Sequence, residues 1–539
     1  MGNNDNRSVN LSTSDDCANC FYFASSNGIW KSTDSGTTWN LAHNGIPTTK
    51  LSRIGITHSE ITPNLLFASV VDSTHNLEGV YKSTNGGTSW TILPKNGILV
   101  IGDVFSSFGW YFGQIRVNPY NDNELSILGV DMYSSNDGGN TWRMSTPVWS
   151  TYQVHADKHD LIYLNTSTTL LATDGGLYKS VDNLATWTDI ETTPTTQFYR
   201  VTVNPFSPSQ NRTYTGGAQD NGTLTGNNSV LNNWSKDFGG DGFKAEFDEI
   251  NGIEYFETQN GNIYSFVGSS GFFHLIQGFN PNDRKNWDMP YMMSNYDNSI
   301  LYCGTEKIYR MIGAPYTSWD SISPDLTNGN IFGNSFHTIS TIDESILDRN
   351  YLYAGTSDGN AWYTSNGGAS WNNITTGLPN RYITSINASW KDKDHIYISH
   401  SGYKYNETIP HIHKSDNNGG TWNDISGNLP NIGINDICLY RNVDSVIFVA
   451  TDDGVYATVN EGISWNRVGG NMPIIPVFDL EIDYDGKKLI AATYARSMQS
   501  FPLDSIIMKA IDPTSIIEKN NLKLNLYPNP VNNVAVVGG

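Results

Sequence analysis

The chain has 539 residues and a net charge of -21, and only 16% of its residues are charged, whereas it holds 50 Gly, 29 Tyr and 15 Trp. This composition is typical of a large, turn-rich β protein. The acidic balance argues against nucleic acid as a partner, because phosphate binding relies on Lys and Arg to release counterions.

The sequence predicts no transmembrane segment, because no run of about 20 apolar residues occurs. The first residues, MGNNDNRSVN, lack the basic and apolar regions of a signal peptide. Four cysteines are too few for a disulfide framework in a chain of this length. Cys17 and Cys20 form a C-x-x-C pair, for which we expect a local disulfide or free thiols rather than a metal site.

Taken in chain order, one short motif returns along most of the sequence. It reads Ser/Thr-x-Asp/Asn-x-Gly-x-Ser/Thr-Trp, as in STDSGTTW (32–39) and STNGGTSW (83–90). Its closing tryptophans are spaced 43 to 52 residues apart, except for one double step of 85 residues, and the missing copy is expected near 271–278. The acidic or amide residues of the boxes are Asp34, Asn85, Asp137, Asp182, Asn366, Asn417 and Asn460.

Each repeat contains the same series of predicted strands. Two alternating segments, such as 198–205 and 351–359, are followed by a short strand such as 79–83, the box, and a tryptophan strand such as 88–93. Four short strands in a unit of 40 to 50 residues are typical of a propeller blade. The sequence therefore predicts an all-β fold, a large β-propeller of about ten four-stranded blades with a partial closing blade. The blades form either one ten-bladed ring or two tandem rings.

The repeated box is predicted to be a structural turn between the third and fourth strands. Its Asp or Asn accepts backbone N–H groups across the turn, and Gly adopts backbone angles that a Cβ would forbid. The Trp that follows buries its ring between neighbouring sheets. A turn that is present about ten times on one face is unsuited to be a single catalytic site.

This box resembles the Asp-box (BNR) repeat of sialidases, of xyloglucanase-type glycoside hydrolases and of sortilin-type receptors. The ordered segments GWYFGQIRVNP (109–119), VHADKHD (154–160), TDGGLYKS (173–180) and GGAQDNGT (216–223) resemble a bacterial family of sortilin-like propellers that carries a glycosyl-hydrolase label. The resemblance spans about residues 20–505. The Arg-Ile-Pro motif of sialidases is missing, since LSRIGIT (51–57) has Gly55 where Pro is expected, so sialidase activity is disfavoured.

The C-terminal segment LKLNLYPNPVNNVAVVGG (522–539) resembles the start of the type IX secretion sorting domain of Bacteroidetes. The resemblance implies three parts: a propeller over 1–505, a linker over 506–521 and a truncated sorting domain over 522–539. It also implies contact with the type IX secretion machinery and a location outside the cell or on the bacterial outer-membrane surface.

The face opposite the boxes carries the unusual polar residues, in the turns between second and third strands and at the entries to innermost strands. We expect a rim that binds ligand there, because propellers usually bind at a concave mouth with convergent polar groups. The rim candidates are His155, His159, Asp174, Gln219, Asp220 and Gln259. We expect the two histidines to be hydrogen-bonded rather than metal ligands. No cofactor is predicted; calcium would suit the acidic composition, but no motif supports it.

Three functions follow from this rim. The first is a binding module for a glycan or a surface protein. The second is a glycoside hydrolase that uses two rim carboxylates, for which Asp157 and Asp241 are the candidates. The third is a structural surface protein. Paired carboxylates with a raised pKa in a cleft would favour the hydrolase, and unperturbed aspartates on a broad, wet, aromatic-lined rim would favour the binding module.

Overall fold

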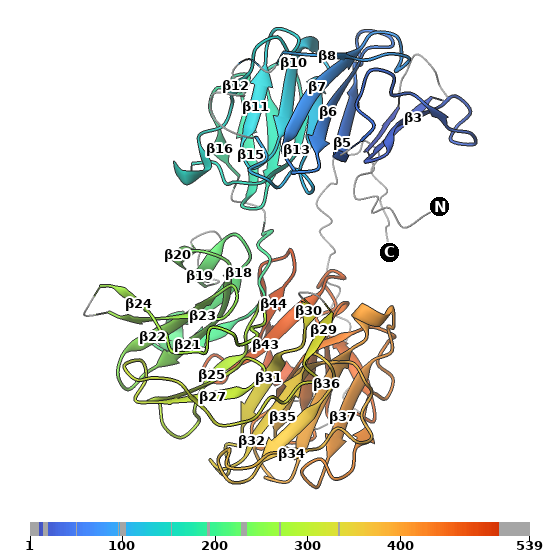
Figure 1. Cartoon of the computed structure of the whole chain (residues 1–539). Helices are drawn as coiled ribbons and strands as arrows, with labels where there is room; N and C mark the ends of the chain where they lie inside the picture. Colours follow the sequence, from blue (N-terminus) through green and yellow to red (C-terminus); the bar gives the residue numbers. More distant parts are fainter. Residues whose placement is uncertain are drawn as a thin grey trace, which may run out of the picture.

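The computed structural model is almost entirely β (Figure 1). It describes residues 10–13, 20–49, 51–94, 96, 104–151, 153–190, 194–227, 234–268, 271–332 and 335–505. Within them, ten sheets have four strands and one has three, all built from antiparallel strands that are consecutive in the chain. This confirms the predicted propeller of about ten blades with a partial closing blade. The predicted linker and sorting domain, 506–539, lie outside the described residues, as does Cys17.

The first four sheets form one group, drawn in blue to green at the top of Figure 1. Successive sheets contact each other through their first strands, β5 with β9 and β9 with β13. The strands of this group are β1 (Asn10–Thr13), β2 (Phe21–Ser25), β3 (Gly28–Ser32), β4 (Asn40–Leu41), β5 (Leu51–His58), β6 (Leu66–Asp72), β7 (Leu77–Ser83), β8 (Thr91–Ile92), β9 (Gln114–Asn118), β10 (Asn121–Leu128), β11 (Met132–Ser135), β12 (Arg143–Met144), β13 (Lys158–Tyr163), β14 (Thr169–Thr173), β15 (Gly176–Ser180) and β16 (Thr188–Asp189), with the 3-10 turn η1 (Trp149–Thr151).

The other seven sheets form the second group, drawn in green to red at the bottom of Figure 1. Its first sheets contain β17 (Thr202–Asn204), β18 (Thr213–Ala218), β19 (Gly222–Gly226), β20 (Ser235–Phe238), β21 (Gly242–Asp248), β22 (Ile253–Thr258), β23 (Asn262–Val267), β24 (Phe273–Leu275), β25 (Tyr291–Met293), β26 (Ile300–Gly304), β27 (Ile308–Ile312) and β28 (Asp320–Ser321), with the turn η2 (Ser209–Asn211). The later sheets contain β31 (Ile339–Glu344), β32 (Leu352–Thr356), β33 (Ala361–Thr364), β34 (Asn372–Asn373), β35 (Tyr382–Ala388), β36 (Ile396–Ser401), β37 (His411–Ser415), β38 (Asn423–Asp424), β39 (Ile434–Leu439), β40 (Ile447–Thr451), β41 (Gly454–Thr458), β42 (Trp465–Val468), β43 (Val477–Asp483), β44 (Lys488–Thr493) and β45 (Met498–Pro502), with the turn η3 (Tyr403–Tyr405).

Two elements of the second group, one expected from the sequence and one not, lie outside the regular series of box repeats. The fourth strand β24 lies where the missing repeat was expected, at 271–278. A hairpin of β29 (Asn330–Phe332) and β30 (Ser335–Phe336) interrupts the blade order and was not predicted.

The second group closes into a ring of seven sheets within the described residues. Its last sheet, β43–β45, packs against its first, since Phe198 and Tyr214 share one buried cluster with Ile490 and Ala492. The backbone N–H of Val201 also donates to Asp479 at 2.8 Å. Because the ring closes over residues 197–503, the blades are arranged as two groups rather than as one ten-bladed ring.

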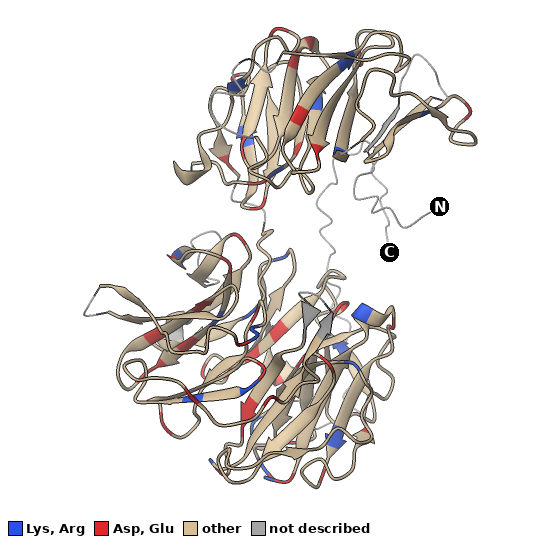
Figure 2. Cartoon of the chain, viewed as in Figure 1, with Lys and Arg blue, Asp and Glu red and all other residues tan. Residues whose placement is uncertain are grey.

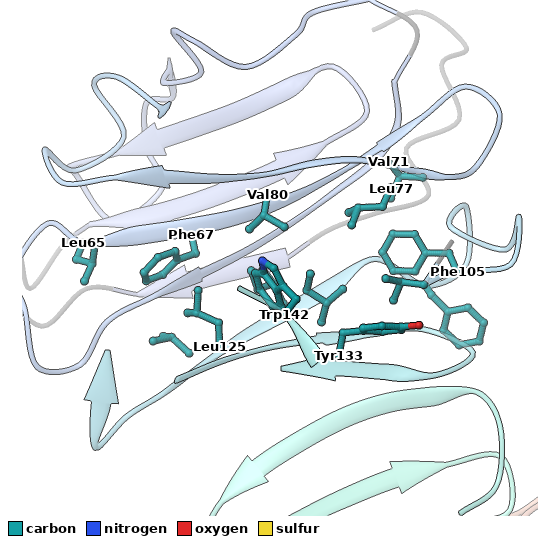
Figure 3. Packing of buried hydrophobic residues seen from close by; sticks show 14 residues of the cluster. Leu65, Phe67, Val71, Leu77, Val80, Phe105, Leu125, Tyr133 and Trp142 are labelled. Atoms are coloured by element: carbon teal, nitrogen blue, oxygen red, sulfur yellow. The ribbon is translucent and has the colours of Figure 1, made fainter. Parts of the chain in front are cut away.

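The core consists of apolar side chains between consecutive sheets. Figure 3 shows the cluster between the second and third sheets, where Phe67, Leu125 and Trp142 are buried. Aromatic and branched side chains on the two facing surfaces exclude water, and this burial is the main stabilising contribution to each blade contact. Acidic residues outnumber basic ones over both groups (Figure 2).

The boxes all adopt one hydrogen-bond pattern. In the third sheet, Ser135 donates to Asp137 Oδ1 at 2.8 Å, that oxygen accepts the N–H of Thr141 at 2.9 Å, and the Ser135 hydroxyl accepts the N–H of Gly139 at 2.9 Å. The same contacts to the carboxyl or amide oxygen recur at Asp34, Asn85, Asp182, Asn366, Asn417 and Asn460. These contacts stay inside the turn, which favours a structural role for the boxes.

Most box tryptophans join their own sheet to the preceding one. The indole N–H of Trp90 donates to the carbonyl of Ala42, and that of Trp465 to the carbonyl of Ile425. The expectation that every ring is buried is wrong for Trp39, which is 37% exposed and donates instead to Gly36 of its own turn. Cys20 is disulfide-bonded, in agreement with the first of the two alternatives for the C-x-x-C pair.

Candidate functional site

The polar residues singled out in the sequence meet where the two groups of sheets face each other. The imidazole Nε2 of His155 lies 3.1 Å from the carbonyl oxygen of Asp220, and the side-chain amide of Asn221 donates to the carbonyl of Asp174 at 3.0 Å. His155, Asp157, His159 and Asp174 come from the last sheet of the first group, whereas Gln219, Asp220, Asp241 and Gln259 come from the first two sheets of the second. The rim expected on one face is therefore corrected to two half-sites, one on each group, because the chain passes from one group to the other between Asp174 and Gln219.

Three carboxylates form the centre of this site. One oxygen from each of Asp157, Asp174 and Asp220 lies within 4.8 Å of the other two. Asp157 and Asp220 have φ angles of 65° and 59°, a left-handed conformation that few residues other than Gly, Asn and Asp adopt. The side chains gather because β13 begins beside the β14–β15 turn, and the β18–β19 turn faces both. We call these three residues the acid trio.

The other predicted residues support the acid trio. Asp241 is buried and its Oδ1 accepts the backbone N–H of Asp220 at 2.8 Å. Gln259 accepts the backbone N–H of Asp241 at 3.1 Å, and Gln219 accepts a hydrogen bond from the hydroxyl of Tyr199 at 2.6 Å. Asp241 and Gln259 thus position the turn that carries Asp220, rather than contributing to the trio themselves.

The proximity of these groups changes their pKa values. Burial, and then the negative charges of Asp241, Asp174 and Asp157, raise the pKa of Asp220 to about 7. Burial and the charge of Asp174 also raise the pKa of Asp157. A hydrogen bond to Asp174 raises the pKa of His159. Near neutral pH the site therefore contains a carboxyl that can give up a proton beside a carboxylate paired with an imidazolium.

Both rim histidines make hydrogen bonds, as expected. The Nδ1 of His155 lies 3.1 Å from the carbonyl of Ala156, and the Nε2 of His159 contacts Asp174. The acid trio offers the oxygen ligands that calcium takes in proteins. A group of acidic side chains alone does not identify a cation site, and we assign none here.

An aromatic cavity opens beside the trio, at the mouth of the seven-sheet ring. It has a volume of about 560 Å³ and is lined by Tyr199, Tyr382, Tyr403, Phe478 and Tyr494, among other residues. We call it the mouth cavity. Burial, and then nearby negative charges that include those of Asp241 and Asp220, raise the pKa of Tyr199 to about 12.

A second cavity of about 290 Å³ lies along the ring axis and shares Arg200 and Asp288 with the mouth cavity. Burial raises the pKa of Asp343 and of Asp436 to about 7, and that of Glu481 to about 8. Arg200 partly neutralises this channel through an ion pair of 2.6 Å with Asp288.

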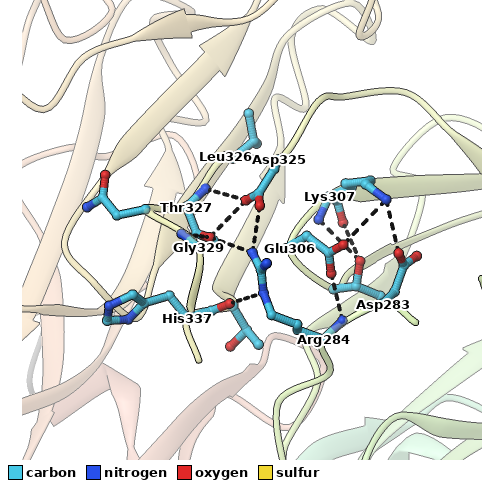
Figure 4. Close-up of polar contacts among 12 residues, drawn as sticks. Asp283, Arg284, Glu306, Lys307, Asp325, Leu326, Thr327, Gly329 and His337 are labelled. Atoms are coloured by element: carbon cyan, nitrogen blue, oxygen red, sulfur yellow. Dashed lines mark hydrogen bonds and ion pairs between the residues drawn. The ribbon is translucent and has the colours of Figure 1, made fainter. Parts of the chain in front are cut away.

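A polar network holds the loop that leads to Asp288. Arg284 donates to the carbonyl of His337 and to Asp325, and its backbone N–H donates to Glu306 (Figure 4). Because Arg284 thereby joins the loop to the neighbouring sheets, the residues that follow it, including the 43% exposed Trp287, are held at the mouth.

The chain is similar to solved structures at low sequence identity. No protein-family profile matches the chain, and no curated protein matches it. Among solved structures, the chain is similar to the GH74 xyloglucanase from Xanthomonas campestris, with 13% identity, coverage of 89% of this chain and 78% of that chain, and a TM-score of 0.27. The GH74 enzyme of Niastella koreensis gives 13% identity, coverage of 93% and 99%, and a TM-score of 0.28. At these values the comparison assigns no activity to this chain.

Among the described residues, no helix has the length and apolar character needed to cross a lipid bilayer.

Proposed function

We propose that this protein is a glycoside hydrolase whose general acid is Asp220. The observation that carries the proposal is the acid trio, in which one carboxyl has a pKa of about 7 and two others lie within 4.8 Å. Glycosidases need one carboxylic acid that is still protonated at working pH and a second carboxylate that attacks or activates water. This arrangement meets the criterion that separated a hydrolase from a binding module in the sequence analysis.

The contacts divide the roles among the carboxylates. Asp174 already accepts hydrogen bonds from His159 and Asp220, so it holds the acid in position. Asp157 is then the candidate nucleophile, and Asp241 positions Asp220 through its backbone N–H. The sequence predicted Asp157 and Asp241 as the catalytic pair. In this proposal Asp220 replaces Asp241 as the acid, and Asp241 is assigned a supporting role.

The separation of the carboxylates supports a retaining reaction. Retaining glycosidases have carboxyl groups about 5 to 5.5 Å apart, whereas inverting ones leave about 6.5 to 9.5 Å for a water molecule. The nearest oxygens of the acid trio lie within 4.8 Å of one another, a spacing nearer to that of the retaining class. In this scheme Asp220 protonates the leaving oxygen while Asp157 bonds to the anomeric carbon, and the deprotonated Asp220 then activates water to release the sugar.

The mouth cavity supports a glycan as the substrate. Aromatic rings such as those of Tyr199 and Phe478 stack on the apolar faces of sugar rings, and a few polar groups fix their orientation. The same cavity favours the second candidate function, a binding module that holds a glycan without cleaving it. We also propose that the protein is exported to the bacterial surface through the type IX machinery. The segment 522–539, whose sequence suggests this export, lies outside the described residues.

The test is a screen of the purified protein against plant, algal and host polysaccharides that measures reducing-end release and retention on the same samples. We expect release by the unaltered protein and a loss of about 100- to 10,000-fold in Asp220→Asn, the usual contribution of a general acid. Asp320→Asn, an exposed carboxyl on β28, is the matched control and should leave release unchanged. Retention without release by the unaltered protein would favour the binding module, and undiminished release by Asp220→Asn would refute the assignment of the acid.

A further inference from the structure

Three histidines share one face of the sheet β35–β38. His411 and His413 are two residues apart on β37, so their side chains point to the same side. His400 lies opposite His411 in the register of the neighbouring strand β36. The rings form a triangle, with centroids 6.4 Å apart for His400 and His411, 5.9 Å for His400 and His413, and 6.4 Å for His411 and His413.

Two of these imidazoles are buried without satisfying their nitrogens. His400 is fully buried, and neither of its ring nitrogens has a hydrogen-bond partner. The Nδ1 of His413 is also buried and unpartnered. A buried polar nitrogen without a partner destabilises the folded state, so proteins rarely keep one without a reason.

The triangle is close to the size of a metal site. Zinc bonds to imidazole nitrogen at about 2.0 to 2.1 Å, which places the ring centres of a tetrahedral site roughly 5 Å apart. The observed spacings exceed this by about 1 Å, so ring rotation with small side-chain shifts would bring the nitrogens together. Within the described residues only the acid trio already has its ligand atoms within 4.8 Å, so the histidines would converge when the ion binds.

A carboxylate stands at the edge of the triangle. The Oε1 of Glu407 lies 2.9 Å from the Nε2 of His411, and Arg381 contacts the same carboxylate. This spacing is about that of two neighbouring ligands on one ion, so Glu407 can serve as fourth ligand or orient His411 as a second-shell partner.

We propose that His400, His411 and His413 form a zinc site at the base of the loop 402–410. Imidazole ligands with one carboxylate suit zinc, whereas calcium and magnesium prefer oxygen alone. The loop begins two residues after His400 and ends just before His411, and it carries Tyr403 and Lys404 into the wall of the mouth cavity. Zinc would therefore fix both ends of the loop and hold Tyr403, which is 81% exposed, at the mouth.

The first experiment uses the full chain without a histidine tag, stripped of metal by a chelator. Cobalt(II) replaces zinc in tetrahedral sites and gives them a strong visible absorption that octahedral oxygen sites lack. We expect one tetrahedral cobalt per chain, displaced by zinc, and a rise in melting temperature with added zinc. Failure of the unaltered protein to give this absorption would overturn the proposal without reference to any variant.

Variants then locate the site. His400→Asn and His413→Asn should each lower zinc affinity by at least tenfold and abolish the tetrahedral absorption. Glu407→Gln keeps the three imidazoles and should weaken zinc by about 10- to 100-fold, so it covers the case in which a histidine variant fails to fold. His274→Asn, on β24, is the matched control. Zinc binding that survives in His413→Asn but disappears in Asp157→Asn would assign the ion to the acid trio and overturn the histidine site.

Discussion

Arg200 is a basic group of the seven-sheet ring that forms ion pairs with carboxylates of two other sheets. It comes from the entry to the first sheet, and its guanidinium lies 2.6 Å from Asp288 at the third sheet and 3.7 Å from Asp479 in the last. We consider Arg200→Met, which keeps an apolar stem of similar length and removes the charge. The variant leaves two carboxylates facing a channel that already contains Asp436 and Glu481.

The expected cost follows from burial. Arg200 is 27% exposed and Asp288 25%, so their ion pair is largely shielded from water. Removing one partner of such a pair costs about 3 to 5 kcal/mol, because the remaining charge is left uncompensated. Arg116→Met is the control: Arg116 pairs with Asp160 at 2.7 Å, but Asp160 is 47% exposed, so this pair should contribute about 1 kcal/mol or less.

The cost should depend on pH. Burial raises the pKa of Asp436 to about 7 and also raises that of Asp479, so the folded ring binds these protons more tightly than the unfolded chain does. The penalty for their charge is absent below the unfolded pKa of about 4 and fully present above the folded pKa, so stability falls as pH rises through this range. Without Arg200 the penalty grows, and Arg200→Met should therefore be destabilised more at pH 8 than at pH 5.

Urea titration followed by tryptophan fluorescence, at pH 5 and at pH 8, measures the free energy of unfolding of the unaltered protein and both variants. A loss below about 1 kcal/mol at pH 8 for Arg200→Met would show that the channel is hydrated well enough to dispense with the guanidinium. An equal loss at the two pH values would refute the reasoning from the channel carboxylates.

Two further predictions concern the boxes. Ser135→Ala should destabilise the first group by about 2 kcal/mol in the same urea titration, because it removes three hydrogen bonds and takes the acceptor from the N–H groups of Asp137 and Gly139; a loss near zero would show that water replaces the hydroxyl. Trp142→Ala should cost about 3 to 5 kcal/mol, because the ring is 5% exposed in the cluster of Figure 3. Trp39→Ala, at the same box position but 37% exposed, should cost clearly less, and equal losses would contradict the structural interpretation of the boxes.

The sequence predicted the blades because their signals are local. A box turn needs only a hydroxyl and a carboxyl or amide oxygen within eight residues, and the tryptophan that follows marks the fourth strand. The second residue after the Asp or Asn is a Gly with a positive φ in every box but one, where Leu184 has a φ of 64°. The division into two groups could not be predicted in this way. The step from Trp187 to Trp234, which crosses the boundary, is 47 residues and falls within the normal spacing. Whether consecutive blades share a ring depends instead on distant contacts, such as those of Phe198 with Ile490.

The candidate site was only partly accessible to the same reasoning. Alternation of strand direction placed Asp157, Asp174 and Asp220 opposite the boxes, at the entry to an innermost strand or in a turn between second and third strands. It did not place them on two groups that face each other. It could not tell Asp220 from Asp241 as the acid. That distinction depends on which carboxylate faces two others and which accepts a backbone N–H, and both contacts depend on how the second group meets the first.

The histidines were missed for a different reason. HIH at 411–413 is visible in the sequence, but its third member, His400, lies on another strand, and the distance of 11 residues between His400 and His411 has no meaning until the register of β36 and β37 is known. In that register the strand that provides His411 also ends the loop that carries Tyr403 to the mouth cavity. An ion bound to the three rings would thus change the order of the cavity wall without contacting a glycan. Zinc should then change glycan retention by the unaltered protein, and this effect should be lost in Glu407→Gln. A change of glycan retention with pH near 7 should instead be lost in Asp220→Asn, so the two sites can be separated experimentally.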